Sequence, residues 1–433
     1  MSKILALAAV IPAVAVASAV QRNRALRTLT IGVPIDPARL TQSTVPIRLG
    51  IARALDQRAG PDPIFVLEAL GESGVEAASR GLMASLETLH RTHDLVFVDE
   101  RGVSVSPLAC SPIADETAAV FDPRQIAHCR HSFDRHTGLG TLNSRTFAAD
   151  VEMARKKLGY RRIELIGYFY GTRIAEQYMR RWPARVSAAV LADASPLTYP
   201  AAEAESGAIS ASIASTLDAC RADQACNAQY PDLAGEWARA SALLSRQSDG
   251  AGLLEWMKHR TVRWSTAANW PRDVDSIARG RGASVLAQYA AYRRTVLATY
   301  PLALRIAVDC AENMPLRLLP KGSDSADEQA ACPAWPVQRA PKPRPSTGRA
   351  IPILAVTAEF DIEAPAGAVR RAFAGNEHAR VVMFPDRARA TDSDWGECLG
   401  PMVTTFLQNK SANGIDTSCA MRLKRPAFTV ADQ

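Results

Sequence analysis

The chain has 433 residues, of which 47% are hydrophobic and 22% charged, so it can bury a full core, and disorder as its main state is excluded. The formal net charge is +7, but the 51 basic residues alternate with 44 acidic ones and form no long basic block. We therefore expect no nucleic-acid partner. No repeat of fixed period is present, which excludes a solenoid.

The N-terminus has the pattern of a secretory signal peptide. Lys3 precedes the apolar stretch 4–16, and residues 17–19 (ASA) form a small-x-small motif typical of signal-peptidase cleavage. We expect residues 1–19 to be removed and the protein to be exported to the periplasm or outside the cell. An uncleaved anchor is the alternative, although Pro12 interrupts the stretch. No later stretch is long and apolar enough to span a membrane.

Eight cysteines agree with export, because an even number in an exported chain favours disulfide bonds. None forms a CxxC pair, and none is placed with a nearby histidine in the way that a zinc site requires. The sequence leaves many connectivities open. Pairing successive cysteines gives four short loops: Cys110 with Cys129, Cys220 with Cys226, Cys310 with Cys332, and Cys398 with Cys419.

Strand-like and helix-like patterns alternate through the first part of the chain. Short apolar runs predict strands at 29–34, 45–53, 63–67, 94–99, 163–167 and 186–191. Apolar residues at helical spacing predict helices at 75–89, 145–158 and 172–181. This alternation predicts an α/β fold, with a mostly parallel sheet and helices on both faces.

The pattern then changes to helix and later returns. Residues 200–345 read as mostly helical and carry four tryptophans that either line a pocket or simply pack: Trp237, Trp256, Trp264 and Trp270. Strands at 351–356 and 380–384 and helices at 364–374 and 398–407 follow. We expect a core in two parts, 20–199 and 346–433 with a C-terminal tail, and a helical cap inserted at 200–345.

The segment 163–173 (IELIGYFYGTR) predicts a sharp turn from strand to helix. Gly167 and Gly171 flank Phe169, which takes the central position that a nucleophile occupies in a G-x-S-x-G elbow. Glycines are needed there because the turn is strained and closely packed.

Five segments resemble the secreted serine aminopeptidases of the α/β-hydrolase fold, the proline iminopeptidase and tripeptidyl aminopeptidase-like group, including its TAP-like C-terminal domain. They lie in the family's order, at 94–102 (DLVFVDERG), 147–186, 332–336 (CPAWP), 351–368 and 406–428. The resemblance implies an α/β-hydrolase fold with an inserted helical cap over nearly the whole mature chain. The implied chemistry is hydrolysis by a Ser-His-Asp triad.

The triad departs from the family pattern at two of three positions. Phe169 replaces the nucleophilic serine and has no oxygen to attack a carbonyl. Asp361 retains the acid position. Arg389 lies nearest the position of the family's histidine, since 385–395 contains none, and His378 precedes the last strand and so belongs to the wrong end of the sheet. We expect Arg389 and Asp361 to form an ion pair where imidazole stood.

The loop that should hold the oxyanion also departs from the family. Residues 67–74 (LEALGESG) place Ala69 and Leu70 where glycines are expected and retain Gly71, while the second N–H donor would come from Tyr170.

These departures predict an exported, non-catalytic relative that binds a peptide or small apolar ligand without a cofactor or metal. The alternative is an active or weakly active aminopeptidase or esterase with another nucleophile. Hydroxyl groups near the predicted turn or in the loop after 94–99 are the candidates: Tyr168, Tyr170, Thr172, Ser104 and Ser106. A buried aromatic at position 169 would favour the first reading, and an exposed Tyr170 or Thr172 the second.

Overall fold

A computed structural model gives the fold. It describes residues 26–38, 43–56, 62–115, 118–133, 138–247, 250–314, 319, 326–335, 337, 339–340, 351–392 and 395–430. The predicted signal peptide at 1–19 lies outside these residues. No helix among them is long and apolar enough to cross a bilayer.

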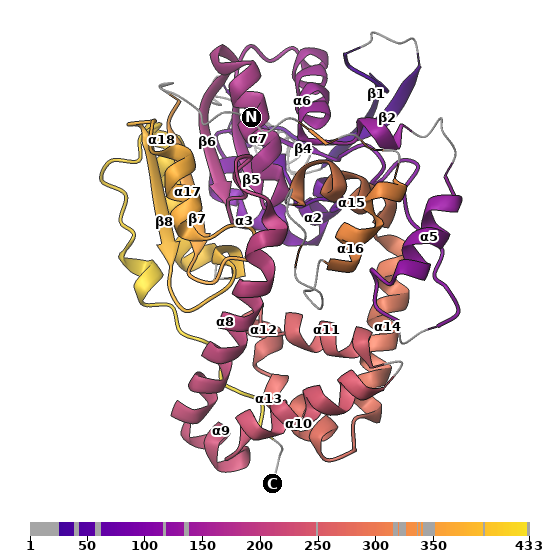
Figure 1. Cartoon of the computed structure of the whole chain (residues 1–433). Coiled ribbons are helices and arrows are strands. Elements are labelled where there is room, and N and C mark those ends of the chain that lie inside the picture. The colour runs from indigo at the N-terminus through magenta and orange to yellow at the C-terminus, as the bar shows by residue number, and fades with distance from the viewer. Residues whose placement is uncertain are drawn as a thin grey trace, which may run out of the picture.

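One eight-stranded sheet forms the centre of the molecule (Figure 1). Its strands are β1 (Arg27–Pro34), β2 (Thr44–Ala52), β3 (Ile64–Leu67), β4 (Leu95–Val98), β5 (Ile163–Tyr168), β6 (Val186–Ala192), β7 (Ile353–Ala358) and β8 (Ala379–Phe384). Their order is β1-β2-β4-β3-β5-β6-β7-β8. β2 runs antiparallel to β1 and β4, and the pairs from β4 to β8 are parallel. The α/β-hydrolase fold expected from the sequence is confirmed.

Helices cover both faces of the sheet, as the alternating pattern predicts. One buried cluster packs α6 (Ser144–Leu158), α7 (Tyr170–Arg181) and α17 (Ala366–Phe373) on one face. A second cluster packs α2 (Gly74–Ala77) and α18 (Gly400–Asn409) on the other. The strands β3 to β7 are buried on both faces, which explains their continuous apolar runs.

The helix expected at 75–89 is wrong as a single element. After α2 the chain forms a π-helical turn η1 (Ala78–Leu82) and two short helices, α3 (Met83–Ser85) and α4 (Glu87–His90). The break lies at Gly81, whose φ of 135° is outside the helical region. Only glycine adopts such a φ at little steric cost, so the apolar spacing alone could not show the interruption.

Between β6 and β7 the chain is helical, as expected. This stretch contains α8 (Ala201–Ala222), α9 (Gln224–Gln229), α10 (Leu233–Arg246), α11 (Ala251–His259), α12 (Trp264–Ala267), α13 (Trp270–Ala278), α14 (Ala283–Thr299), α15 (Leu302–Val308), η4 (Asp309–Asn313), α16 (Ala326–Ala331) and η5 (Cys332–Ala334). The helices α9 to α14 enclose a core of their own beyond the carboxyl ends of the strands. In contrast, α15 packs into the core of the hydrolase sheet.

The four tryptophans of this region pack against neighbours. Trp237 and Trp270 lie 5.0 Å apart between ring centroids, and Trp256 packs on Tyr289 at 5.8 Å. Trp264 lies under the guanidinium group of Arg387, at 3.8 Å, and donates a hydrogen bond to the Asp386 carbonyl oxygen at 3.2 Å. These contacts favour ordinary packing over the alternative that the four tryptophans line a pocket.

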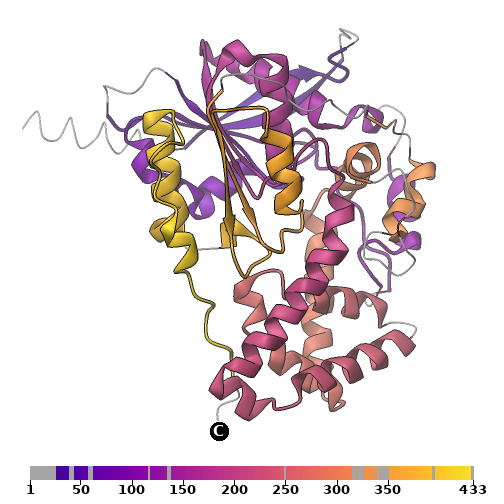
Figure 2. The same cartoon turned by 60° about the vertical axis from the view of Figure 1, so that its left-hand side comes forward.

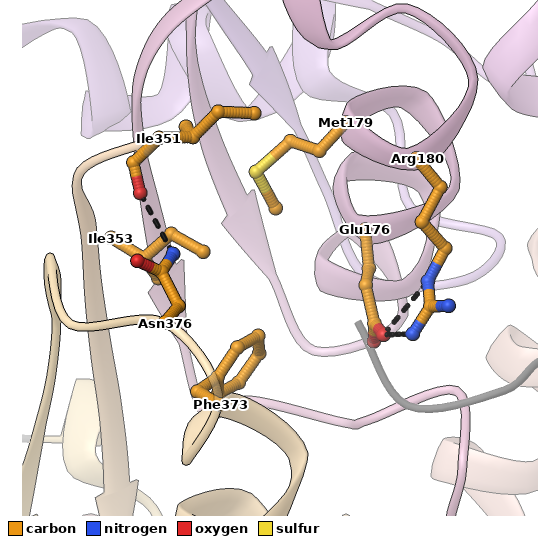
Figure 3. Close-up of a pocket in the computed structure, with 7 residues that line it drawn as sticks. All are labelled: Glu176, Met179, Arg180, Ile351, Ile353, Phe373 and Asn376. Carbon is orange, nitrogen blue, oxygen red and sulfur yellow. Dashed lines mark hydrogen bonds and ion pairs between the residues drawn. The ribbon is translucent and has the colours of Figure 1, made fainter. Parts of the chain in front are cut away.

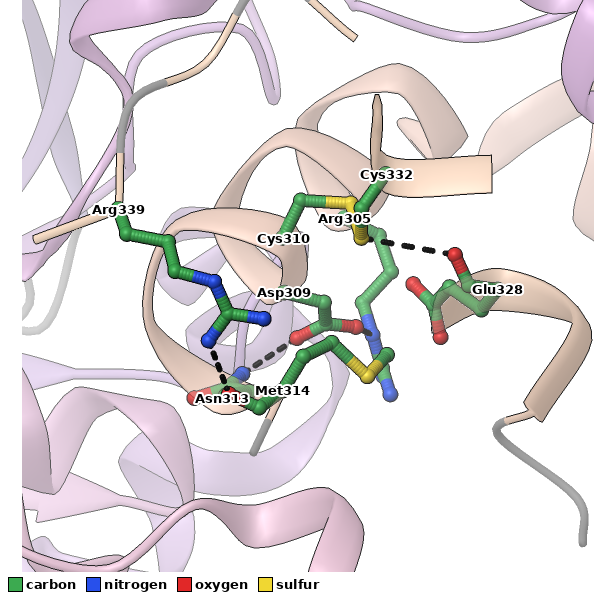
Figure 4. The surroundings of a disulfide bond; sticks show 8 residues. All are labelled: Arg305, Asp309, Cys310, Asn313, Met314, Glu328, Cys332 and Arg339. Carbon is green, nitrogen blue, oxygen red and sulfur yellow. Dashed lines mark hydrogen bonds and ion pairs between the residues drawn. A yellow bond between two sulfur atoms is a disulfide. The ribbon is translucent and has the colours of Figure 1, made fainter. Parts of the chain in front are cut away.

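All eight cysteines are paired in the successive order: Cys110–Cys129, Cys220–Cys226, Cys310–Cys332 and Cys398–Cys419. Figure 4 shows the third bond, which ties η5 to η4 beside the ion pair of Arg305 with Asp309. Four disulfides are typical of proteins that fold in an oxidising compartment.

The C-terminal tail crosses from the sheet to the helical insertion (Figure 2). Arg425 binds the Asp386 carboxylate at 2.8 and 3.0 Å and donates hydrogen bonds to Ser215 and Thr216 of α8. The Thr429 N–H donates to the Ala268 carbonyl oxygen at 2.9 Å. The tail thus joins the β8 loop to the inserted helices.

Candidate functional site

The strand-to-helix turn keeps the geometry of a nucleophile elbow. Phe169 follows β5 with φ 50° and ψ −118°, and α7 begins at the next residue. A Cβ on Gly167 would lie 2.7 Å from the Gly171 carbonyl oxygen, and a Cβ on Gly171 would lie 2.2 Å from that of Leu67. Both glycines are therefore required by close packing, as the sequence predicts.

Phe169 occupies a backbone conformation that is costly for a bulky residue. Its N–H donates to the Ala192 carbonyl oxygen at 3.0 Å, and its own carbonyl oxygen accepts from the Thr172 N–H at 3.0 Å. The Thr172 hydroxyl donates to the same oxygen at 2.5 Å. The ring is partly buried, and the Arg389 guanidinium carbon lies 4.6 Å from its centroid. Phe169 and Arg389, which the sequence analysis assigns to the nucleophile and base positions, are thus stacked on each other.

Asp361 lies in the turn after β7, where the sequence places the acid. Its carboxylate accepts hydrogen bonds from the Thr357 hydroxyl at 2.9 Å and from the N–H groups of Ala358 and Glu363 at 3.2 and 2.9 Å. Burial, and next the nearby charge of Asp193, raise the pKa of this carboxyl well above its usual range. The Asp361 carboxylate is therefore hydrogen-bonded by residues of the strand end and turn in which it lies.

The expected ion pair between Asp361 and Arg389 is not among the ion pairs of the described residues. The guanidinium group of Arg389 lies over the Phe169 ring. Its charge also acts on two other carboxyls, Asp193 and Glu363, where it opposes the rise in pKa that burial causes.

A second buried acid, Asp193, was not among the candidates. It follows β6 with φ 48° and is fully buried. One carboxylate oxygen accepts from the Ala390 N–H at 2.5 Å, and the other accepts from the N–H, at 3.2 Å, and the hydroxyl of Thr391. Asp193 therefore fixes the loop that carries Arg389. A carboxylate directly after a buried strand was the signal that could have identified it.

The loop after β3 is held by contacts with the segment after β4 and with Tyr300 at the end of α14. Gly71 has φ 79°, and its N–H donates to a Glu100 carboxylate oxygen at 3.1 Å. The Tyr300 hydroxyl donates to the Leu70 carbonyl oxygen at 2.8 Å, and a Cβ on Gly71 would lie 2.9 Å from the Tyr300 ring. The carbonyl oxygen of Ala69 accepts from the Glu72 N–H at 2.9 Å. The Gly71 N–H is thus engaged within the protein, so it is not presented to an oxyanion.

The hydroxyl groups of Tyr170 and Thr172, beside Phe169, are buried and hydrogen-bonded. Tyr170 is 3% exposed and donates to a Glu312 carboxylate oxygen at 2.8 Å, and burial raises its pKa well above the usual range. Thr172 is 2% exposed and accepts from the Ser195 N–H at 2.9 Å. Burial likewise raises the pKa of Tyr168 well above its usual range. Neither Tyr170 nor Thr172 is exposed, as the alternative of another nucleophile would require, while Phe169 itself is only partly buried.

The serines of the loop after β4 do not complete a catalytic site. Ser104 belongs to a polar cluster in which its hydroxyl donates to Asp99 and accepts from Arg48 at 2.9 Å. Ser106 is exposed with φ 59°. His378 directly precedes β8, and its carbonyl oxygen accepts from the Ile353 N–H at the amino end of β7. Among the described residues, no histidine stands beside the elbow.

A pocket lies at the amino end of β7, away from the elbow (Figure 3). Ile351 and Ile353 line it at the start of β7, together with Glu176 of α7. Phe373, the last residue of α17, and Asn376 beyond that helix complete the lining. The elbow is at the carboxyl end of β5, so this pocket does not belong to the triad positions.

Comparisons with known proteins find sequence similarity over part of the chain. The TAP-like protein family matches residues 320–419. The serine protease Hip1 of Mycobacterium tuberculosis, and the same protein of Mycobacterium bovis, are 32% identical over 142 residues. That match covers 28% of this chain and 27% of Hip1, so the chain matches only about a quarter of the length of this relative.

Two solved structures are similar over most of the chain. Proline iminopeptidase of Mycobacterium smegmatis aligns with a TM-score of 0.41 at 14% identity, covering 88% of this chain and 98% of that one. An esterase of Thermogutta terrifontis aligns with a TM-score of 0.42 at 13% identity, covering 88% and 99%. The strand order gives the chain the α/β-hydrolase fold, residues 320–419 match the TAP-like protein family, and about a quarter of the chain is similar to Hip1.

Proposed function

We propose that this protein is a non-catalytic member of the α/β-hydrolase fold. It binds a peptide or a small apolar ligand at the carboxyl ends of the sheet strands, beneath the inserted helices. The observation that carries the proposal is the stacked pair of Phe169 and Arg389 at the positions of a nucleophile and a base.

The chemistry of acyl transfer supports this proposal. Phe169 offers no lone pair to a carbonyl carbon, and a guanidinium group stays protonated and cannot act as a general base. Loss of the nucleophile or the base alone costs a serine hydrolase about 10⁶-fold in kcat. The engaged N–H of Gly71 removes a further source of rate acceleration, since an oxyanion donor is worth roughly 10²–10³-fold.

The retained elbow supports a binding role. The glycine contacts of Gly167 and Gly171 preserve the backbone on which the family places its ligand, while Phe169 adds a partly buried apolar face. Fold similarity alone does not define function. We therefore take the ligand class from the apolar face of Phe169 and from the similarity to the serine protease Hip1.

The proposal is tested by initial-rate hydrolysis of aminoacyl, prolyl and tripeptidyl chromogenic amides and of short esters. We expect the wild type to match its heat-inactivated control. Phe169→Ser with Arg389→His is the repair variant, and Phe169→Ala is the matched control that opens the same space without a nucleophile. Wild-type turnover above the control would overturn the proposal.

The binding half is tested separately with the same peptides as uncleavable amides. We expect saturable changes in intrinsic tryptophan fluorescence for the wild type, weakened at least about tenfold by Phe169→Asp, which places a charge on the apolar face. Equal affinity of both proteins for every binding peptide, or no binding to any member of the panel, would contradict a ligand site at the elbow.

A further inference from the structure

The C-terminal tail is fixed to the molecule at three successive points. Cys419 is bonded to Cys398, just before α18, so a disulfide attaches the start of the tail to the sheet domain. Arg425 then binds the Asp386 carboxylate in the loop after β8. Beyond it, Phe428 packs against the core of the inserted helices. The tail therefore starts at one core and ends at another (Figure 2).

Asp386 is the point at which the tail, the inserted helices and the β8 loop meet. Its carboxylate accepts two hydrogen bonds from Arg425, at 2.8 and 3.0 Å, and one from the Ser215 hydroxyl of α8 at 2.6 Å. Its carbonyl oxygen accepts from the indole N–H of Trp264 in α12 at 3.2 Å. The Arg425 side chain is only 13% exposed, and two parallel bonds hold its guanidinium group in one orientation on the carboxylate.

The tail between its last two contacts is short. Only two residues separate Arg425 from Phe428, and an extended chain advances at most about 3.6 Å per residue, so the two Cα atoms lie no more than about 11 Å apart. The Thr429 N–H donates to the Ala268 carbonyl oxygen at 2.9 Å and fixes the far end. The inserted helices therefore cannot move away from the β8 loop unless one of these contacts breaks.

The inserted helices are held unequally on their two sides, α8 and α14, which lie opposite each other in Figure 1. On the α14 side, Leu297 and the following helix α15 pack into the large core of the sheet domain. On the α8 side, the apolar cluster shared with the loops after β7 and β8 is small. Its buried members in the described part of the chain are Ile209, Val262 and Ala388.

We propose that residues 422–430 act as a strap, which holds the α8 side of the inserted helices over the carboxyl ends of the strands. When the strap is released, these helices move outward about the α14–α15 side, and the elbow becomes more accessible. Asp386 connects the strap to the elbow, because Arg389 follows it by three residues and lies on the Phe169 ring. The strap acts on the position of the helices, so the inference is independent of the proposed ligand.

The experiment measures the distance between two spin labels, attached at Leu243→Cys in α10 and Met153→Cys in α6. Both side chains are exposed, at 42% and 39%, so the labels displace no core residue. One helix belongs to the inserted region and the other packs on the sheet, so the distance reports their relative position. We expect a single narrow distribution in the full chain. A chain that ends after Leu423 should show a shifted mean and a broader distribution.

A linker insertion distinguishes a strap from simple packing of the tail. Six Gly and Ser residues between Pro426 and Ala427 leave every tail residue in place but raise the greatest span from Arg425 to Phe428 to about 32 Å. We expect this variant to show the shifted, broader distribution of the truncated chain. The same insertion after Val430, beyond the last contact, is the matched control and should give the distribution of the full chain.

Two outcomes would overturn the proposal. One is an unchanged distribution in the truncated chain. The other is a full-chain distribution in the variant with the linker after Pro426, which would show that the tail acts only by packing. Because that variant keeps the whole tail, the test remains decisive if the truncated chain does not fold.

Discussion

The guanidinium group of Arg389 lies on the ring of Phe169, 4.6 Å from its centroid. The two residues come from the β8 loop and the β5–α7 turn, the two segments that bring base and nucleophile together in a serine hydrolase. The cation–π contact therefore joins these two segments. Asp193 anchors the β8 loop independently, through Ala390 and Thr391.

This contact should be measurable as a coupling energy. Arg389→Ala and Phe169→Ala are expected to destabilise the protein, with a coupling of about 1 kcal/mol in a double-mutant cycle. Urea unfolding of the four proteins measures it. Additive effects of the two substitutions would show that the stacking contributes nothing to stability.

The elbow glycine at position 171 should tolerate no side chain. Gly171→Ala places a Cβ 2.2 Å from a backbone oxygen of β3, so we expect a loss of more than about 3 kcal/mol or failure to fold. Gly207→Ala is the control, since its Cβ meets nothing within 4 Å in the middle of α8 and should stabilise by up to about 1 kcal/mol. Chemical unfolding measures both. A well-folded Gly171→Ala protein of wild-type stability would refute the close packing.

Glu68, at the end of β3, should make stability fall as pH rises. Burial, and next the charge of Glu72, raise the pKa of Glu68 from 4.5 to about 7. The folded state then holds a proton that the unfolded state has released between these two values, so stability decreases as pH rises from about 4.5 to 7 and stays low above it.

Glu68→Gln should remove this part of the pH dependence. We expect it to stabilise the protein at pH 8 by at most about 3 kcal/mol and to change little at pH 4. The exposed Glu72→Gln is the comparison variant and should give a smaller effect. Urea unfolding from pH 4 to 8 measures the slopes. Parallel curves for Glu68→Gln and the wild type would contradict the raised pKa.

The tail contact of Arg425 should stabilise the junction of the β8 loop and α8. Arg425→Ala removes its bonds to Asp386, Ser215 and Thr216, and we expect a loss of about 1–2 kcal/mol because the Asp386 side chain is half exposed. Limited proteolysis near residue 424 should become faster. The neighbouring Lys424→Ala, an exposed position, should behave like the wild type. Equal cleavage rates would mean that the tail is held by other contacts.

The sequence allowed much of this arrangement to be predicted. Gly167 and Gly171 predicted the elbow, because a closely packed turn requires a glycine on each side of Phe169. The sequences of β3, β4 and β5 predicted buried strands, because they are apolar without alternation. The successive cysteine pairs were one of many connectivities until the fold brought each pair within 5.5 Å between Cα atoms.

Other features depend on contacts between distant segments. Arg389 stacks on an aromatic ring instead of forming the expected ion pair with Asp361, and the anchor of its loop is Asp193, about two hundred positions earlier. The closed state of the Gly71 loop depends on Tyr300 from the inserted helices. No local pattern encodes these pairings, since each is set by which strand ends and loops lie side by side.

The most direct test of the central claim is the intact mass of the wild-type protein after incubation with a fluorophosphonate, a reagent that forms a covalent bond with activated hydroxyl nucleophiles. The Phe169→Ser, Arg389→His variant is run beside it as the repaired counterpart. A catalytically inert site predicts an unchanged wild-type mass. A single stoichiometric adduct on the wild type, mapped to Tyr170, Thr172 or Ser104, would contradict the account and identify a working nucleophile.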